Sequence, residues 1–327
     1  MKRDARIDNL RAVLIFLVVL GHLYDTVFFP TSVFQTTLIY SFHVPAFAFI
    51  SGVCFKYRGQ DDRRILKNLL YPYVIFQIVW YLFFHYVLKT NQELQFTTPF
   101  WTQWYLLSMA FWYAAATLLG KLGPKGEAAV MAVSILLALQ VGYDPDVFYF
   151  LSASRTVVLF PFFYLGVIFS RHESLQDFCR GIPAKILGLI LAAGAAVYYA
   201  LKRGSFNNLW LRHSYPYHAL GYNWQVRGIT LALAVGIILF LMAWLPGKKV
   251  RLLTWIGQNT MPVFVIHGFA VKYLQPKLNW KMYFIEKPIL ALPACLGVAL
   301  VLVLVLSSKP VVWLTRPLMR WPFGRSK

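Results

Sequence analysis

Ten apolar segments, separated by short polar stretches, make up most of the chain. Most of them approach the roughly 20 residues that an α-helix needs to cross a bilayer. They lie near residues 10–29, 36–55, 69–88, 100–119, 128–142, 155–170, 184–201, 228–245, 252–271 and 288–308. This pattern predicts an all-α fold, a polytopic membrane bundle of about ten transmembrane helices.

The fifth and sixth segments, 128–142 and 155–170, are shorter than the rest. They fit either two full crossings or one re-entrant pair. The re-entrant alternative would leave eight crossings and would not change the orientation of any later segment. The sequence shows no internal repeat, low-complexity stretch or long polar appendage. Residues 1–327 are therefore expected to form a single integral-membrane domain.

Composition supports a membrane protein. The 327 residues are 59% hydrophobic and only 13% charged, against roughly 25% charged residues in a soluble domain. The net charge of +20 also raises the question of nucleic-acid binding, but the positive residues lie between apolar segments and not on a polar domain. Nucleic acid is therefore not an expected partner. The chain is expected to be a multi-pass protein of the cell (cytoplasmic) membrane.

The distribution of Lys and Arg predicts the orientation. If the N-terminus lies inside, the segments on that side carry 21 Lys and Arg residues and the segments on the opposite side carry 10. Short cytoplasmic loops of membrane proteins carry an excess of Lys and Arg. Both termini are thus predicted to be cytoplasmic.

The first apolar segment contains ionisable residues, in the stretch RIDNLRAVLIFLVVLGH (6–22). Eleven residues separate Arg11 from His22. In an α-helix, a separation of eleven residues corresponds to about 20° beyond three full turns. The two side chains therefore share a face and lie about 16 Å apart along the axis. Asp8 and Asp25 fall within about 60° of the same stripe. Ionisable groups inside membranes usually face a cavity, so the stripe is expected to line a path from the cytoplasmic surface to mid-membrane.

Such a stripe suits a transporter as well as an enzyme. For each residue alone a simpler interpretation also stays open, in which Arg11 extends to the interface and His22 bonds a neighbouring helix.

Several motifs, in order along the chain, resemble those of one family. RIDNLRAVLIFLVVLGH resembles the Arg-x10-His motif of the acyltransferase-3 family, here Arg11 to His22. YSFHVPAFAFISGVCFK (40–56) is similar to its second-helix motif, and RRILKNLLYPYVIF (63–76) to its basic loop before a Pro-Tyr helix start. WYLLSMAFW (104–112) is most similar to the fucose O-acetylase branch, and MPVFVIHGFAV (261–271) to a late helix that ends near a histidine.

The resemblance implies a membrane O-acetyltransferase. Members of this family move an acyl group, usually acetyl from acetyl-CoA, to hydroxyls of cell-surface glycans or lipid-linked precursors. Acetyl-CoA is thus the expected co-substrate, with no tightly bound cofactor, and a glycan or lipid-linked sugar the expected acceptor. Some members carry an extracytoplasmic hydrolase-like domain. Because the chain ends 19 residues after its last apolar segment, that domain is expected to be absent, which implies direct transfer or a separate partner protein.

Acyl transfer to an alcohol needs a base for the hydroxyl proton. His22 is the expected base, because the ordinary histidine pKa of ~6.5 is close to neutral pH; a transient acyl-histidine is an alternative. Asp25 is the expected orienter of His22. Arg11 is expected either to engage the thioester donor or to fix the helix by pairing with Asp8. Asp8 itself is expected to be structural.

His43 and its neighbours come from the second apolar segment. His43 is a candidate second polar group that faces His22, and it can equally well bond a backbone carbonyl freed by Pro45. Ser51 and Gly52 are expected to be structural and to permit close helix approach.

Charged and aromatic segments supply the candidate substrate contacts. Arg63, Arg64 and Lys67, in the basic loop 56–68, are expected to hold the phosphates of CoA, unless the loop only sets topology and attracts anionic lipid. Aromatic and histidine side chains on the predicted outer side are candidates for binding the sugar acceptor, although an interfacial aromatic belt explains them nearly as well. They are Trp104, Tyr105, Trp210, His218 and Trp224.

The sequence also bears on a metal site and on other functions. Cys54, Cys179 and Cys295 are far apart and have no metal-ligand spacing, so no metal site is expected. A transporter or flippase of a lipid-linked sugar is the main rival, and use of another acyl-CoA is a variant of the enzyme hypothesis. Transport would be favoured by interrupted helices in two corresponding halves, and the sequence shows no such pairing.

Overall fold

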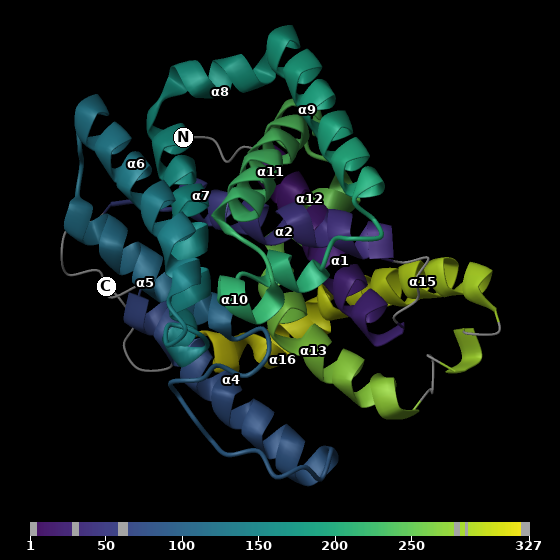
Figure 1. Cartoon of the computed structure of the whole chain (residues 1–327). Helices are drawn as coiled ribbons and strands as arrows, with labels where there is room; N and C mark the ends of the chain where they lie inside the picture. Colours follow the sequence, from purple (N-terminus) through teal and green to yellow (C-terminus); the bar gives the residue numbers. More distant parts are fainter. Residues whose placement is uncertain (1–4, 28–32, 58–64, 278–281, 285–286, 322–327) are drawn as a thin grey trace.

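The computed structural model describes residues 5–27, 33–57, 65–277, 282–284 and 287–321, and within these residues every regular element is helical (Figure 1). Short π-helical and 3-10 turns supplement the α-helices: η2 (Leu66–Leu70), η3 (Phe83–Val87), η4 (Val141–Tyr143), η5 (Phe150–Ser152) and η6 (Asn208–Arg212). The α-helices are α1 (Ala5–Val27), α2 (Val33–Val53), α4 (Tyr71–Leu82), α5 (Trp104–Leu119), α6 (Pro124–Gln140), α7 (Ala153–Arg171), α8 (Glu173–Arg180), α9 (Ile182–Leu201), α10 (Tyr217–Leu220), α11 (Trp224–Trp244), α12 (Arg251–Gln258), α13 (Thr260–Lys277), α15 (Pro288–Leu306) and α16 (Lys309–Met319).

Eight helical stretches of the described chain are long and apolar enough to cross a membrane. The all-α polytopic membrane fold is thus confirmed. The two short apolar segments, 128–142 and 155–170, belong to stretches Pro124–Tyr143 and Phe150–Arg171 of 20 and 22 residues. By length, each of these stretches can make a full crossing.

Two of the ten expected spans differ from this set. The apolar helix at 100–119 is α5, which has only 16 residues. The span at 252–271 is divided into α12 and α13 at Asn259, whose side-chain amide donates to the carbonyl of Trp255, 2.8 Å away, and so caps α12. Pro262, in the first turn of α13, has no N–H for the carbonyl of Gln258. Together these two residues interrupt the helix.

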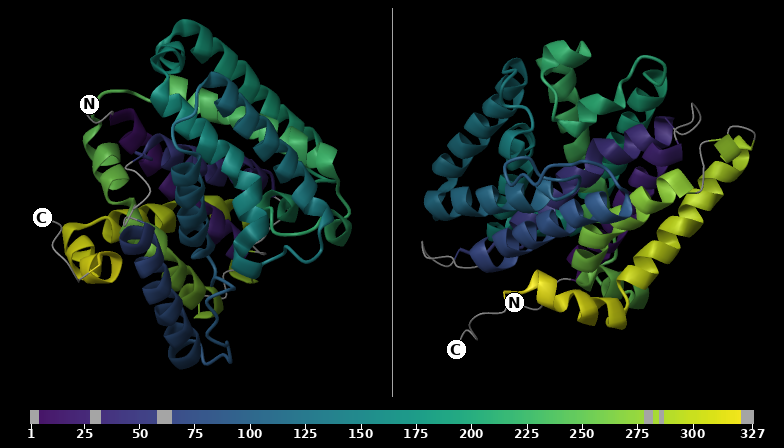
Figure 2. Two further views of the ribbon diagram at one scale, coloured as in Figure 1. Left: turned by 90° about the vertical axis from the view of Figure 1, so that its left-hand side faces the viewer. Right: turned by 90° about the horizontal axis from the view of Figure 1, so that it is seen from below.

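Helices α1 and α2 lie in the middle of the bundle (Figure 1). Helix α1 packs against α12, α13 and α15, and α2 packs against α7 and α11. Their buried side chains form two adjoining hydrophobic clusters. Figure 2 shows α15 and α16 at one edge of the molecule and α6 at another.

Glycines allow two close helix crossings in this interior. A Cβ atom on Gly52 of α2 would lie 1.8 Å from the carbonyl oxygen of Phe163 in α7, and one on Gly166 would lie 2.0 Å from that of Phe49. A Cβ atom on Gly257 of α12 would likewise lie 1.8 Å from the carbonyl oxygen of Asp8. These positions have no room for a Cβ atom, so only glycine permits the close contacts α2–α7 and α1–α12.

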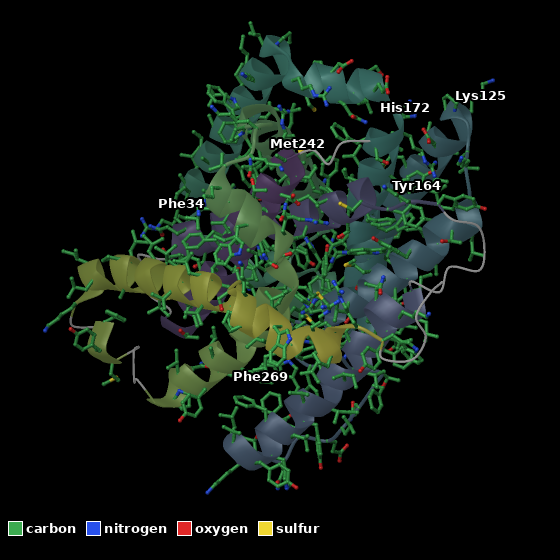
Figure 3. All side chains as sticks on the ribbon, turned by 180° about the vertical axis from the view of Figure 1, so that it is seen from behind. Phe34, Lys125, Tyr164, His172, Met242 and Phe269 are labelled. Carbon is green, nitrogen blue, oxygen red and sulfur yellow. The ribbon has the colours of Figure 1, made fainter. Side chains whose placement is uncertain are left out.

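Several helix ends lie on one side of the molecule. The start of α1 and α16 lie on the same side in the left view of Figure 2. Figure 3 shows Lys125 and His172 at one end of the molecule, with Met242 toward that end and Phe269 at the other. Lys125, His172 and Met242 mark the start of α6 and the ends of α7 and α11, which the charge count assigns to one side. Which side of the membrane this is stays a prediction.

Candidate active site

His22 lies five residues before the end of α1, with a side chain only 18% exposed. Its ring centroid lies 4.6 Å from that of Trp101 and 5.4 Å from that of His267 in α13, with which it stacks. Trp101 itself has a left-handed backbone (φ 43°), and its ring fills the space that a Cβ on Gly268 would occupy. Left-handed backbone in a bulky residue is uncommon and concentrates at functional sites.

The loop that delivers Trp101 is held by one buried amide. The Gln77 side chain, fully buried in α4, donates to the carbonyls of Gln95 and Thr98 at 2.6 and 3.0 Å and accepts from the N–H of Phe100 at 3.0 Å. Gln77 thereby fixes the backbone next to the tryptophan that covers His22.

A chain of hydrogen bonds connects His22 to a carboxylate. Its Nδ1 lies 3.3 Å from the hydroxyl of Tyr40 in α2, and that hydroxyl donates to Oδ2 of Asp25. Since the Tyr40 proton goes to Asp25, its oxygen accepts from Nδ1–H, which leaves Nε2 of His22 as the basic atom. The direct distance from Nδ1 to Asp25 is 4.0 Å, so Asp25 contacts His22 chiefly through Tyr40. Arg212 donates to the same carboxylate oxygen at 3.1 Å.

Two more histidines have a fixed tautomer. Nδ1 of His43 lies 2.6 Å from the carbonyl of Ile39, and Nδ1 of His267 lies 2.8 Å from that of Val263. A carbonyl can only accept, so both rings carry hydrogen on Nδ1 and present Nε2 as an acceptor. The bond of His43 is to Ile39 and not to the carbonyl of Ser41, which Pro45 leaves without its helical partner. Nε2 of His267 is buried without a partner among the described residues.

Three cavities follow one another along α1. The first, of about 340 Å³, is lined along this helix by Arg11, Ile15, Val18 and His22. The second, of about 120 Å³, is lined by His22 and Asp25, and the third, of about 630 Å³, by Asp25 and Tyr24. We call them the inner cavity, the chamber and the outer cavity. The inner cavity and the chamber share His22, His43, Val44, Thr102 and Trp104.

The inner cavity has Arg11 near its end farthest from His22. The Arg11 guanidinium lies 3.9 Å from the carboxylate of Asp8 and donates to Sγ of Cys54 at 3.1 Å. Asp8 also accepts from Gln258, at 3.2 Å, and is buried at the α1–α12 contact. Eleven helical residues separate Arg11 from His22 by about 16 Å, so one small reacting group cannot touch both.

Side chains from α2 and α5 form another wall of the inner cavity. The Ser51 hydroxyl lies 2.9 Å from that of Tyr105, and both residues line the cavity. Trp104, like His43, lines both the inner cavity and the chamber. Of the residues expected to bind acceptor, Trp104 and Tyr105 therefore share a cavity with His22.

The other expected acceptor residues lie elsewhere. Trp210 stacks on Tyr222 with centroids 5.5 Å apart and donates to the carbonyl of Leu220, His218 is exposed, and Trp224 is 47% exposed at the start of α11. None of these three lines the cavities along α1. The same segment instead contributes Leu211, Arg212 and His213 to the chamber.

The basic loop falls only partly within the described residues. Arg63 and Arg64 lie outside them. Lys67 is half-buried in η2, two residues before Leu69, which lines the inner cavity. Among the described residues, no group of three or more His, Cys, Asp or Glu side chains is placed to hold a metal ion.

Sequence reasoning did not assign roles to several residues of this site. They are Tyr40, His267, Trp101, Arg155 and Arg212. A polar residue within an apolar segment was the available signal for His267 in MPVFVIHGFAV. Tyr40 begins the quoted motif YSFHVPAFAFISGVCFK, but nothing in its spacing indicates a contact with Asp25.

Comparison with known proteins identifies the family of the chain. The family model for the acyltransferase domain of the acyltransferase-3 family matches residues 4–308, nearly the whole chain. It does not single out the fucose O-acetylase branch. No curated protein and no solved structure gave a significant match. Coverage of this extent shows that the chain belongs to the acyltransferase-3 family of membrane acyltransferases.

Proposed function

We propose that this acyltransferase moves acetyl from acetyl-CoA to a hydroxyl of a cell-surface glycan or lipid-linked sugar. The observation that carries the proposal is the position of His22, whose side chain lines both the inner cavity and the chamber. A base at such a junction can meet a donor that enters from one end of α1 and an acceptor that enters from the other. The family match supports the acyl transfer itself.

His22 acts as the general base in this proposal. Its Nε2 takes the proton of the acceptor hydroxyl while the hydroxyl oxygen attacks the thioester carbonyl carbon. The carbon–sulfur bond then breaks, and the CoA thiolate leaves and takes up the proton from His22. The products are an O-acetyl ester and CoA. Tyr40 and Asp25 hold the ring so that Nε2 faces the reactants and stabilise the imidazolium that forms.

Arg11 and the basic loop bind the donor in this proposal. CoA carries its phosphates at the far end of a long flexible arm from the thioester, so a thioester at His22 places the phosphates toward Arg11. Arg63, Arg64 and Lys67 are the further donor contacts we propose. The half-buried Lys67 next to Leu69 supports this for one of the three.

The test is an assay of purified protein with labelled acetyl-CoA and a glycolipid extract of the host membrane. We expect label to move to a lipid-linked or polymeric glycan, with mass spectrometry identifying an added acetyl ester. A transporter of lipid-linked sugars would neither hydrolyse acetyl-CoA nor transfer acetyl. His85→Ala is the matched control, because His85 is an exposed histidine outside the three cavities, and it should leave transfer unchanged.

A further inference from the structure

The chamber between His22 and the outer cavity carries more positive than negative charge. Arg155 of α7 and Arg212 of η6 both line it, and Asp25 is its one carboxylate. An arginine is permanently charged. Both arginines are half-buried, where a charge without a nearby anion is less favourable than in water. The chamber therefore lacks one negative charge for balance.

Asp25 is already occupied by other partners. Its Oδ2 accepts from Arg212 at 3.1 Å and also from the hydroxyl of Tyr40. No described hydrogen bond or ion pair connects it to Arg155. One carboxylate thus neutralises one of the two arginines and orients the base as well.

Arg155 is held in place by neutral groups. Its Nε donates to the carbonyl of Arg212, at 3.2 Å, and to the hydroxyl of Ser214. Its guanidinium carbon lies 4.8 Å from the ring centroid of Trp104 and 5.4 Å from that of Tyr149. No described residue accepts a hydrogen bond from its terminal amino groups. These contacts fix the guanidinium at the chamber wall and leave its paired donors for a ligand.

His213, a histidine of the chamber wall, does not change this balance. Burial, with Arg227 and Arg155 nearby, lowers the pKa of His213 to about 3. It is therefore neutral at physiological pH and adds no further positive charge.

We propose that the acceptor carries a carboxylate or phosphate near the hydroxyl that is acylated, and that Arg155 and Arg212 bind this anion in the chamber. Arginine presents two parallel N–H donors that match a carboxylate or a phosphate. The inference rests on the proposed function and names the class of acceptor: an acidic sugar or a sugar phosphate.

The cavity sizes agree with an acceptor that enters from the outer cavity. The chamber, about 120 Å³, has room for roughly four water-sized groups and hence for one functional group of a glycan. The outer cavity is about five times larger, at 630 Å³, and shares Asp25 and Arg212 with the chamber. A sugar in the outer cavity can therefore extend its anion past this ion pair. The phosphates of CoA lie toward Arg11 in the proposed reaction, away from Arg155.

Direct binding to the purified full-length protein tests the proposal without acyl transfer. The probes are phenyl β-D-glucuronide and phenyl β-D-glucoside, which differ only in a carboxylate in place of a hydroxymethyl group, and glucose 1-phosphate. Calorimetry is expected to give a lower Kd for at least one anionic probe than for the glucoside, by about 10- to 150-fold, the range for a charge-assisted hydrogen bond. Preference for the glucuronide identifies a carboxylate, and preference for glucose 1-phosphate identifies a phosphate.

Variants connect this preference to Arg155. Arg155→Gln should abolish the preference for the anion, and Arg155→Lys should keep part of it because lysine retains the charge but lacks the planar fork. Arg180→Gln removes an arginine that is 53% exposed on α8 and should leave the preference intact. If neither anion binds more tightly than the glucoside, or if Arg155→Gln keeps the full preference, the proposal is wrong. Anion binding without acetyl transfer would leave this site standing and refute only the proposed function.

Discussion

Tyr40 determines which ring nitrogen of His22 is free to act as a base. Its hydroxyl donates to Asp25 and lies 3.3 Å from Nδ1 of His22. Through this hydroxyl the carboxylate of Asp25, which lies 4.0 Å from Nδ1 of His22, can still orient the imidazole ring. A histidine oriented in this way keeps Nε2 unprotonated and aimed at the acceptor.

Replacing Tyr40 by Phe tests this arrangement. Tyr40→Phe removes the hydroxyl between His22 and Asp25 but keeps the ring, so we expect kcat to fall about 10- to 100-fold, as is typical when the partner that orients a histidine is lost. KM for acetyl-CoA should stay constant, because Tyr40 does not line the inner cavity. Tyr164→Phe is the control: it also deletes one buried hydroxyl, which has no hydrogen-bond partner among the described residues. Equal kcat values for the two variants would contradict a role for Tyr40.

Arg11 should affect the donor and not the chemical step. Its distance of about 16 Å from His22 excludes contact with the same small group. Arg11→Ala should raise the Kd for acetyl-CoA by about 10-fold or more, the loss of one charge-assisted contact, and Arg11→Lys should recover only part. Calorimetry on folded protein measures both. An unchanged Kd in Arg11→Ala would leave only the pairing with Asp8, and Arg11 would then be a packing residue.

Residue-level prediction from the sequence succeeded where one helix carried the pattern. Helical periodicity places Arg11 and His22 on one face, and both line the inner cavity. The contacts of His22 with Tyr40, Trp101 and His267 join separate elements, and no periodicity within one element predicts them. Trp210 shows the converse, because its aromatic character suggested a sugar contact while its ring packs on Tyr222.

At the scale of elements, the α2–α7 crossing supports the position of the site. Helix α2 carries Tyr40 and His43, and α7 carries Arg155. Gly52 and Gly166 let the two backbones touch. These glycines therefore hold together two helices that both contribute residues to the chamber.

A methyl group at this crossing is expected to destabilise the protein. In Gly166→Ala the added Cβ would lie 2.0 Å from the carbonyl oxygen of Phe49, which forces the helices apart at a cost of about 1–3 kcal/mol. Gly194→Ala, in α9, meets nothing within 4 Å, and alanine is the better helix former by about 1 kcal/mol. Thermal unfolding in detergent should give a lower Tm for Gly166→Ala and an equal or higher Tm for Gly194→Ala. A wild-type Tm for Gly166→Ala would show that the crossing is not tightly packed.

The hydropathy pattern predicted most helices and missed how one of them is divided. An apolar window averages over Asn259 and Pro262, so it gives one span at 252–271, while the capping amide of Asn259 and the missing N–H of Pro262 produce α12 and α13. Capping depends on single residues, and a hydropathy average does not register it. The helical stretches at 124–143 and 150–171 are 20 and 22 residues long, and this length favours two crossings over a re-entrant pair.

For the whole molecule, orientation decides which substrate meets which cavity. The excess of Lys and Arg, 21 against 10, predicts cytoplasmic termini, and this places the Arg11 end of the inner cavity toward cytoplasmic acetyl-CoA. Two exposed positions report on it, Gly123 before α6 and Ser205 after α9. In a variant without Cys54, Cys179 and Cys295, a membrane-impermeant thiol reagent should label Ser205→Cys in intact cells. It should label Gly123→Cys only after permeabilisation, and the reverse pattern would put the donor on the wrong side.

In the proposed reaction His22 is the base at which the donor and acceptor paths meet. The most direct measurement of this role is acetyl transfer by His22→Ala, normalised to monodisperse folded protein, together with acetyl-CoA affinity by calorimetry. We predict a loss of about 10² to 10⁴ in turnover, about 3 to 5 kcal/mol of transition-state stabilisation, with the Kd for acetyl-CoA close to that of the wild type and of His85→Ala. Near-normal turnover of folded His22→Ala protein would contradict the account and leave His22 as a helix-packing residue.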